Sequence, residues 1–153
     1  GRNRHLTQTS RSWRRFATPA VNVQIGLPVI ADTNFLIDLL REKTRGRPGP
    51  ASSFLDQNRE TELATTIITV GELAVGYEQL EDARKFFSRI PLFRLSVESA
   101  YEASRVDREL REIGLRLGEN DNWIAGIARY HGETLISNDK AFGRVHGLKV
   151  VTY

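Results

Sequence analysis

Cysteine is absent from this 153-residue chain. Its absence excludes a disulfide scaffold, a thiolate zinc site and a cysteine nucleophile, and it is typical of proteins that work in a reducing cytoplasm. Long apolar runs are also missing, because the most apolar stretch, near residues 63–71, is short and rich in threonine. A helix that spans a bilayer needs about 20 apolar residues. We therefore expect a cytoplasmic protein without a membrane segment.

Other classes of chemistry lack the residues they need. The three histidines, His5, His131 and His146, do not have the spacing of metal ligands, and no serine is spaced with histidine and aspartate as in a catalytic triad. The composition, 40% hydrophobic and 27% charged, is that of one globular domain. A chain of this size buries roughly 70% of its unfolded surface and holds a core without covalent cross-links.

Positive charge is concentrated at the start of the chain. Residues 1–31 contain five arginines and no acid, whereas the remaining residues contain 17 bases against 19 acids. Residues 1–28 show no helical or strand periodicity and are rich in arginine, serine and threonine. We predict that they form a basic, flexible extension, for which solvated disorder and an RNA-binding arm both stay open. The folded domain is expected over residues 29–153.

From residue 29 onward, short β-type runs alternate with helical ones, which is typical of a mostly parallel sheet with helices on its faces. The candidate strands are residues 29–31, 63–66, 92–95, 134–137 and 148–152. The candidate helices are marked by the stripe Phe35, Leu36, Leu39 and Leu40, by residues 97–116, and by Ile124, Ile127, Ala128 and His131. Residues 47–50, with two prolines and a glycine, are predicted to be a loop.

Four acids occupy special places in this pattern. Asp32 directly follows the first strand and Asp139 comes just past the fourth, while Glu72 and Asp121 lie near the starts of helices. Each has a structural alternative. Asp32 is a good helix cap, Thr69 and Glu72 match a capping box, an acid such as Asp121 is favoured by the helix dipole, and Asp139 suits a turn.

Taken together, the four acids indicate a metal site. Ligands of open parallel sheets bind beyond the carboxyl ends of the strands, so all four side chains are expected in one crevice. At about 5 Å and an effective dielectric of about 20, each pair of carboxylates repels by roughly 3 kcal/mol. The only base within these motifs is Lys140. A hard divalent cation, Mg²⁺ or Mn²⁺, is the natural counter-charge, and it would prepare water for attack on a phosphodiester.

The four motifs resemble those of PIN-domain ribonucleases, most closely the VapC-type toxins of toxin–antitoxin pairs. The resemblance covers residues 29–153 and is carried by Val29-Ile30-Ala31-Asp32-Thr33-Asn34, Gly71-Glu72-Leu73-Ala74-Val75-Gly76, Asn120-Asp121-Asn122-Trp123-Ile124-Ala125 and Ser137-Asn138-Asp139-Lys140-Ala141-Phe142. It implies an α/β three-layer sandwich with a central, mostly parallel sheet. It also implies a Mg²⁺- or Mn²⁺-dependent endoribonuclease that cuts RNA and forms a homodimer inhibited by an antitoxin protein.

The resemblance assigns roles to particular residues. Asp32, Glu72, Asp121 and Asp139 would be the catalytic and metal-binding acids, and Thr33 or Asn34, Asn120 and Ser137 would orient them. The chain departs from the family pattern in its 28-residue basic extension and in Gly126, where many members carry alanine.

RNA contacts outside the acids are less specific in the sequence. Arg41, Lys43, Arg45 and Arg47, opposed only by Glu42, are suited to an RNA backbone but are equally typical of a solvated loop. Trp123 and Tyr130 are candidates for stacking on bases, although core packing is the simpler role for Trp123.

Two other functions stay open. One is a PIN-like module that binds RNA or protein without cutting. The other is a phosphohydrolase or phospho-acceptor domain, against which stands Asn34, where haloacid-dehalogenase-like phosphatases need a second aspartate.

Overall fold

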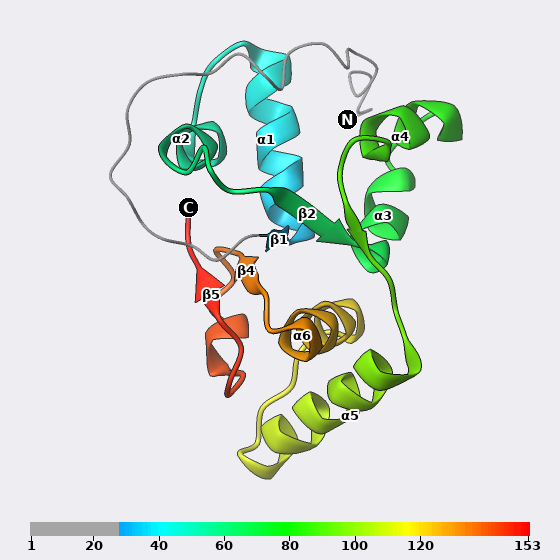
Figure 1. Ribbon diagram of the computed structural model, residues 1–153, viewed down its shortest axis with the longest axis vertical. Helices are drawn as coiled ribbons and strands as arrows, with labels where there is room; N and C mark the ends of the chain where they lie inside the picture. The colour runs from blue at the N-terminus through cyan, green and yellow to red at the C-terminus, as the bar shows by residue number, and fades with distance from the viewer. Residues whose placement is uncertain (1–27) are drawn as a thin grey trace.

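A parallel sheet of five short strands forms the centre of the molecule, in the order β3-β2-β1-β4-β5 (Figure 1). The computed structural model describes residues 28–153. The predicted extension, residues 1–28, therefore lies outside the described residues apart from Pro28. The strands are β1 (Val29–Ala31), β2 (Leu63–Thr66), β3 (Leu92–Phe93), β4 (Thr134–Ile136) and β5 (Val150–Val151).

Helices connect the strands, as parallel pairing requires. They are α1 (Thr33–Arg45), α2 (Pro50–Gln57), α3 (Ile67–Ala74), α4 (Leu80–Phe87), α5 (Val97–Glu112), α6 (Glu119–His131) and the 3-10 turn η1 (Phe142–Arg144). None of the helices within residues 28–153 combines the length and the apolar character that a membrane span requires.

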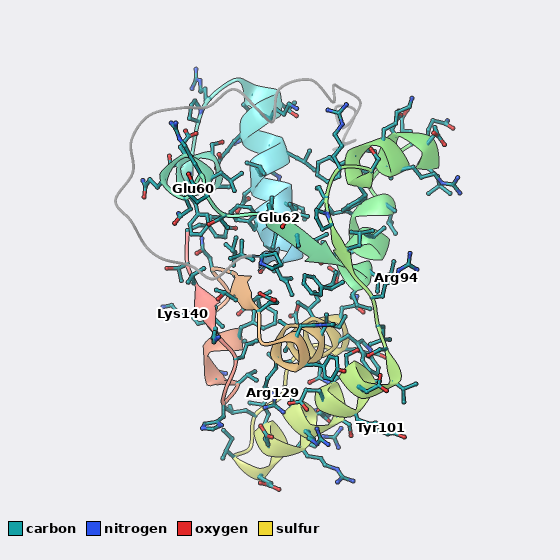
Figure 2. All side chains as sticks on the ribbon, viewed as in Figure 1. Glu60, Glu62, Arg94, Tyr101, Arg129 and Lys140 are labelled. Atoms are coloured by element: carbon teal, nitrogen blue, oxygen red, sulfur yellow. The ribbon has the colours of Figure 1, made fainter. Side chains whose placement is uncertain are left out.

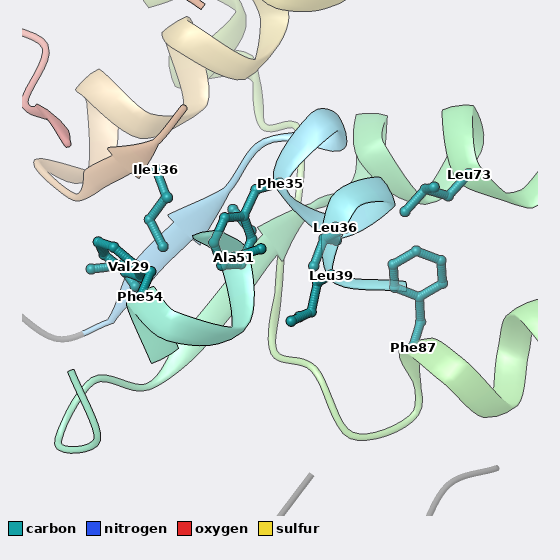
Figure 3. Close-up of a cluster of buried hydrophobic side chains, with 10 residues drawn as sticks. Val29, Phe35, Leu36, Leu39, Ala51, Phe54, Leu73, Phe87 and Ile136 are labelled. Atoms are coloured by element: carbon teal, nitrogen blue, oxygen red, sulfur yellow. The ribbon is translucent and has the colours of Figure 1, made fainter. Parts of the chain in front are cut away.

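Two apolar clusters, one on each face of the sheet, show that the fold has three layers. On one face, Val29 and Ala31 of β1 pack against α1, α2, α3 and α4 (Figure 3). On the other face, Ile30 packs against α5, α6 and η1. Figure 1 shows α5 and α6 on the opposite side of the sheet from α1. The predicted three-layer α/β sandwich with a central parallel sheet is confirmed.

The sequence pattern placed some boundaries wrongly. The strands predicted over 92–95 and 148–152 shrink to two residues each, and the helix predicted over 97–116 ends at Glu112, shortly before Gly114 with a φ of 74°. Such a positive φ suits glycine and ends the helix. Helices α2 and α4 were not predicted.

Helix α2 begins inside the predicted loop because of two local features. Proline is well tolerated at the first position of a helix, and Pro50 stands there. The preceding cap residue is Gly49, which has no side chain to offer. Glu42 of α1 takes over that task by accepting hydrogen bonds from the backbone amides of Gly49 (3.0 Å), Ala51 (3.0 Å) and Ser52 (2.8 Å).

Candidate active site

Asp32 lies at the point where β1 becomes α1 and is almost fully buried, with 3% of its surface exposed. Its backbone amide donates to Ile136 O on β4 at 3.1 Å, which holds it between two neighbouring strands. One carboxylate oxygen, Oδ1, accepts from the amide of Phe35 at 2.8 Å and caps the helix. The predicted capping role is therefore real, but it uses only part of the acceptor capacity of a carboxylate.

Ser137, the residue after β4, links two of the acids. Its hydroxyl donates to Oδ2 of Asp32 and accepts from the backbone amide of Asp139 at 3.1 Å. Asp139 is exposed, and its Oδ1 accepts from the amide of Ala141 at 2.9 Å, as expected of an aspartate that stabilises a turn. The contact with Asp32 agrees with the prediction that Ser137 orients a carboxylate, whereas its contact with Asp139 is to the backbone.

Asp121 lies in the first turn of α6 and is partly buried. The cap residue of this helix is Gly118, so no side chain satisfies the free amides at its start. The helix is fixed from behind by Asn122, whose Nδ2 donates to Ala103 O on α5 at 2.9 Å. Close packing of the two helices requires Gly126, because a Cβ there would lie 2.5 Å from Cβ and 2.6 Å from Cα of Ala103.

Glu72 lies in the second turn of α3, and the predicted capping box with Thr69 is wrong. The cap of α3 is Thr66, whose hydroxyl accepts from the amide of Thr69 at 3.3 Å. Glu72 therefore has no capping role. Its Oε1 is buried and has no hydrogen-bond partner among the described residues. A buried acceptor without a partner is costly, so this oxygen is available to a water or a ligand, as are the buried side-chain oxygens of Asn58 and Asn122.

The four acids influence one another electrostatically. Burial raises the pKa of Asp32, outweighing the hydrogen bonds from Ser137 and Phe35, and the charges of Asp121 and Asp139 raise it further. Burial likewise raises the pKa of Asp121, and Asp139 and Glu72 add to the effect. The charges of neighbouring acids thus disfavour ionisation of Asp32 and of Asp121.

No basic side chain neutralises this group within residues 28–153. The ion pairs found there involve other acids, and the exposed Lys140 (Figure 2) is not in any of them. The same part of the chain also contains no set of three acidic or histidine side chains arranged tightly enough to hold a metal ion as it stands. The arrangement is an open cluster of oxygens and not a closed cage.

The polar residues around the acids differ from the sequence prediction in two ways: some predicted contacts are absent among the described residues, and other contacts were not predicted. Thr33 was expected to orient a carboxylate, but its hydroxyl donates to Thr69 Oγ1 at 3.3 Å, which joins α1 to the helix that carries Glu72. For Asn34 and Asn120 no hydrogen bond to the four acids is found among the described residues. Asn138 and Tyr153 were not singled out, because no local pattern shows that they meet each other.

Comparison with known proteins identifies the family of this chain. The model of the PIN domain family matches residues 29–148. Ribonuclease VapC2 of Haemophilus influenzae is 31% identical over 131 residues, which cover 80% of this chain and 96% of the relative.

Two solved structures have the same fold. The VapBC2 complex of Rickettsia felis, bound to a promoter DNA fragment, has a TM-score of 0.68 at 23% identity, with 84% of this chain and 99% of that chain covered. The DNA-bound VapBC of Salmonella typhimurium has a TM-score of 0.66 at 24% identity, with 84% and 98% covered. This chain thus belongs to the PIN-domain family and is related to the VapC ribonucleases, as the four motifs predicted.

Proposed function

We propose that this chain is a Mg²⁺- or Mn²⁺-dependent endoribonuclease in which Asp32, Glu72, Asp121 and Asp139 form the active site. The observation that carries the proposal is that these four acids influence one another electrostatically, while none of the ion pairs found within residues 28–153 involves any of them. Burial raises the pKa of Asp32 and that of Asp121, and the charges of neighbouring acids raise both further. A protein keeps such a repulsive group at a functional site and balances it with a bound charge.

The residues fit a hard divalent cation. All donors are oxygens, and the buried Oε1 of Glu72 has no partner among the described residues. Mg²⁺ is commonly bound through one or two carboxylates and keeps several of its waters, so it does not need a preformed cage. When bound, such an ion supplies positive charge for the phosphate oxygens and lowers the pKa of an attacking water.

The chain's own residues hold this site in shape. Ser137 and the amide of Phe35 fix both oxygens of Asp32, and the Asn122 contact with Ala103 O fixes the start of α6. The unsatisfied amides at that helix start give it partial positive charge, which favours an anionic phosphate nearby. No covalent nucleophile is required, because water is the attacking group.

RNA, an antitoxin and a second copy of the chain are the partners that we propose. The solved relatives are toxin–antitoxin complexes, which supports a role as the toxin of such a pair. The basic run predicted as a loop lies mostly in the last turns of α1, and its single acid, Glu42, accepts hydrogen bonds from the amides at the start of α2. Arg45 and Arg47 are exposed beside it and are suited to an RNA backbone. The family assignment leaves an inactive PIN-like module as the alternative, and no observation favours it.

Removal of the metal tests the proposed activity. EDTA should abolish cleavage of total RNA, and excess Mn²⁺ should restore it, with 5′-phosphate ends on the products. The variant Asp107→Asn is a matched control, because Asp107 is an acid on α5 that pairs with Arg111 at 2.8 Å, away from the quartet. It should cleave like the unmodified chain. Cleavage that persists in EDTA would contradict the proposal, and saturable Mn²⁺ binding without cleavage would favour the inactive module.

A further inference from the structure

Asn138 and Tyr153 form a clasp at the edge of the sheet that carries the acids. The side chain of Asn138 pairs with the backbone of Tyr153 twice: Oδ1 accepts from Tyr153 N at 2.9 Å, and Nδ2 donates to Tyr153 O at 3.0 Å. One residue earlier, Ser137 N donates to Val151 O at 2.9 Å. The amide side chain thus continues the β4–β5 pairing beyond the strand end, in place of a peptide group.

The side chain of Tyr153 carries this connection on to α1. Its hydroxyl donates to Asp38 Oδ2 at 2.8 Å. Its ring meets the ring of Phe35 edge to face, with 4.8 Å between centroids and an interplanar angle of 89°. Burial, Asp38 and the neighbouring acids raise the pKa of Tyr153, so the phenol stays neutral and keeps donating.

The clasp lies next to two of the proposed catalytic acids, Asp139 and Asp32. Asn138 directly precedes Asp139, and Phe35 is the residue whose amide caps Asp32. Ser137, the residue before Asn138, donates its hydroxyl to Asp32 Oδ2 and accepts from the backbone amide of Asp139. Asp139 is exposed, and its only hydrogen bonds found within the described residues are local ones that shape its own turn. The position of the Asp139 side chain is therefore set by the residues that anchor its turn.

We propose that Asn138 and Tyr153 are positioning residues, which fix the Asp139 turn against α1 so that Asp139 and Asp32 face the same bound cation. The inference rests on the proposed function of the site. It assigns to this chain two residues that act through Asp139 and that do not themselves contact the cation or the RNA.

The test measures Mn²⁺ binding and catalysis in the full chain. Mn²⁺ titration, followed through the electron paramagnetic resonance of the free ion, should show about 10-fold weaker binding for Asn138→Ala, the lower end of what loss of a supporting residue costs a metal site. Tyr153→Phe keeps the ring contact and loses only the hydroxyl, so a measurable loss of Mn²⁺ affinity that is smaller than that of Asn138→Ala is expected. For both variants kcat should fall while KM for RNA is unchanged.

Two matched controls separate positioning from general stability. Asn58→Ala removes an asparagine whose Nδ2 donates to Phe54 O at 2.7 Å at the end of α2, and Tyr101→Phe alters an exposed tyrosine on α5 (Figure 2). Neither should change Mn²⁺ affinity, even if Asn58→Ala lowers the melting temperature. Tyr153→Phe keeps the test valid if Asn138→Ala does not fold.

The possible results are distinct. Weakened Mn²⁺ binding in both clasp variants, with unchanged binding in the controls, supports the inference. Clasp variants that bind Mn²⁺ like the unmodified chain overturn it and leave the proposed function intact. An unmodified chain that neither binds Mn²⁺ saturably nor cleaves RNA in its presence overturns the proposed function, and the inference with it.

Discussion

Carboxylates lie near both ends of helix α6, but those near its start have acidic neighbours and those near its end are paired with an arginine. At its start, Asp121 lies among other acids and its pKa is raised by burial, Asp139 and Glu72. Near its end, Arg129 binds Glu102 at 2.5 Å and Glu109 at 2.6 Å, both on α5 (Figure 2). Burial alone would raise the pKa of Glu102, but hydrogen bonds from Arg105 and Arg129 outweigh it and lower the pKa.

The difference separates carboxylates that are paired within the fold from the carboxylates of the proposed site. The acids facing Arg129 have their counter-charge built into the chain, and Arg129 also donates to His146 O at 3.0 Å, so that α5, α6 and the loop before β5 are tied together. The acids around Asp121 have none within the described residues. Acids paired with an arginine stabilise the folded protein, whereas the unpaired acids around Asp121 lower its stability until a ligand binds.

Among substitutions at the two ends of α6, the largest expected effect is the loss of catalysis in Asp121→Asn. Asp121→Asn should reduce RNA cleavage at least 100-fold, because the variant loses a charged oxygen ligand while keeping its size. Glu109→Gln, at the other end of the helix pair, should cleave within about 3-fold of the unmodified chain, since a partly exposed ion pair contributes little. Initial rates on a labelled RNA measure both. Equal losses in the two variants would contradict the division.

Arg129→Met should have the largest effect on stability. Only 10% of the Arg129 side chain is exposed, and its removal leaves Glu102, 16% exposed, without its interhelical partner. Removing one partner of a buried pair costs about 3 kcal/mol, or roughly 6–12 °C in melting temperature for a chain of this size. Arg105→Met is the control, because that side chain is 67% exposed and its pair is worth at most about 1 kcal/mol. Similar melting temperatures for the two variants would show that burial does not matter here.

Asp121→Asn should stabilise the metal-free protein. The substitution removes a charge that is partly buried beside Asp139 and Glu72, so we expect a gain of about 1 kcal/mol, or roughly 2–4 °C. Adding Mn²⁺ should raise the melting temperature of the unmodified chain and leave that of the variant nearly unchanged. Asp107→Asn, which loses a surface ion pair, should not gain stability. A lower melting temperature of Asp121→Asn in EDTA would contradict the repulsion argument.

The fold and the candidate acids of the proposed site were predicted from the sequence because their signals are local. The alternation of short apolar runs with helical stripes predicted the parallel sheet, and strand-end or helix-start positions predicted Asp32, Glu72, Asp121 and Asp139 as site residues. Helix α2 was missed because its cap comes from Glu42, eight positions before Pro50, and a local capping pattern does not include such a residue.

The supporting contacts were harder to predict because they join residues far apart in the chain. The hydroxyl of Ser137 meets Asp32 across 105 positions, and Tyr153 meets Asp38 across 115. Glu72 shows the opposite error, since Thr69 and Glu72 fit a capping pattern that the structure does not use. The cap of α3 is Thr66, three residues before the predicted cap Thr69. Thr66 is also the last residue of β2, because the chain passes from the strand into the helix without a loop.

The smallest expected effect is on the pH dependence of stability, where the two ends of α6 should differ in sign. The pKa of Glu102 is lowered in the folded state, so its contribution is present above the unfolded value, about 4.3, and is lost as pH falls through the folded pKa. The pKa of Asp121 is raised, so the folded state holds its proton more tightly and stability is lost as pH rises from about 3.9 through the folded pKa. In urea unfolding of the metal-free protein between pH 3 and 7, Glu102→Gln should therefore fall progressively below the unmodified chain as pH rises. Asp121→Asn should rise progressively above it over the same range. Curves that separate in the same direction would mean that the carboxylates at the start of α6 are neutralised after all.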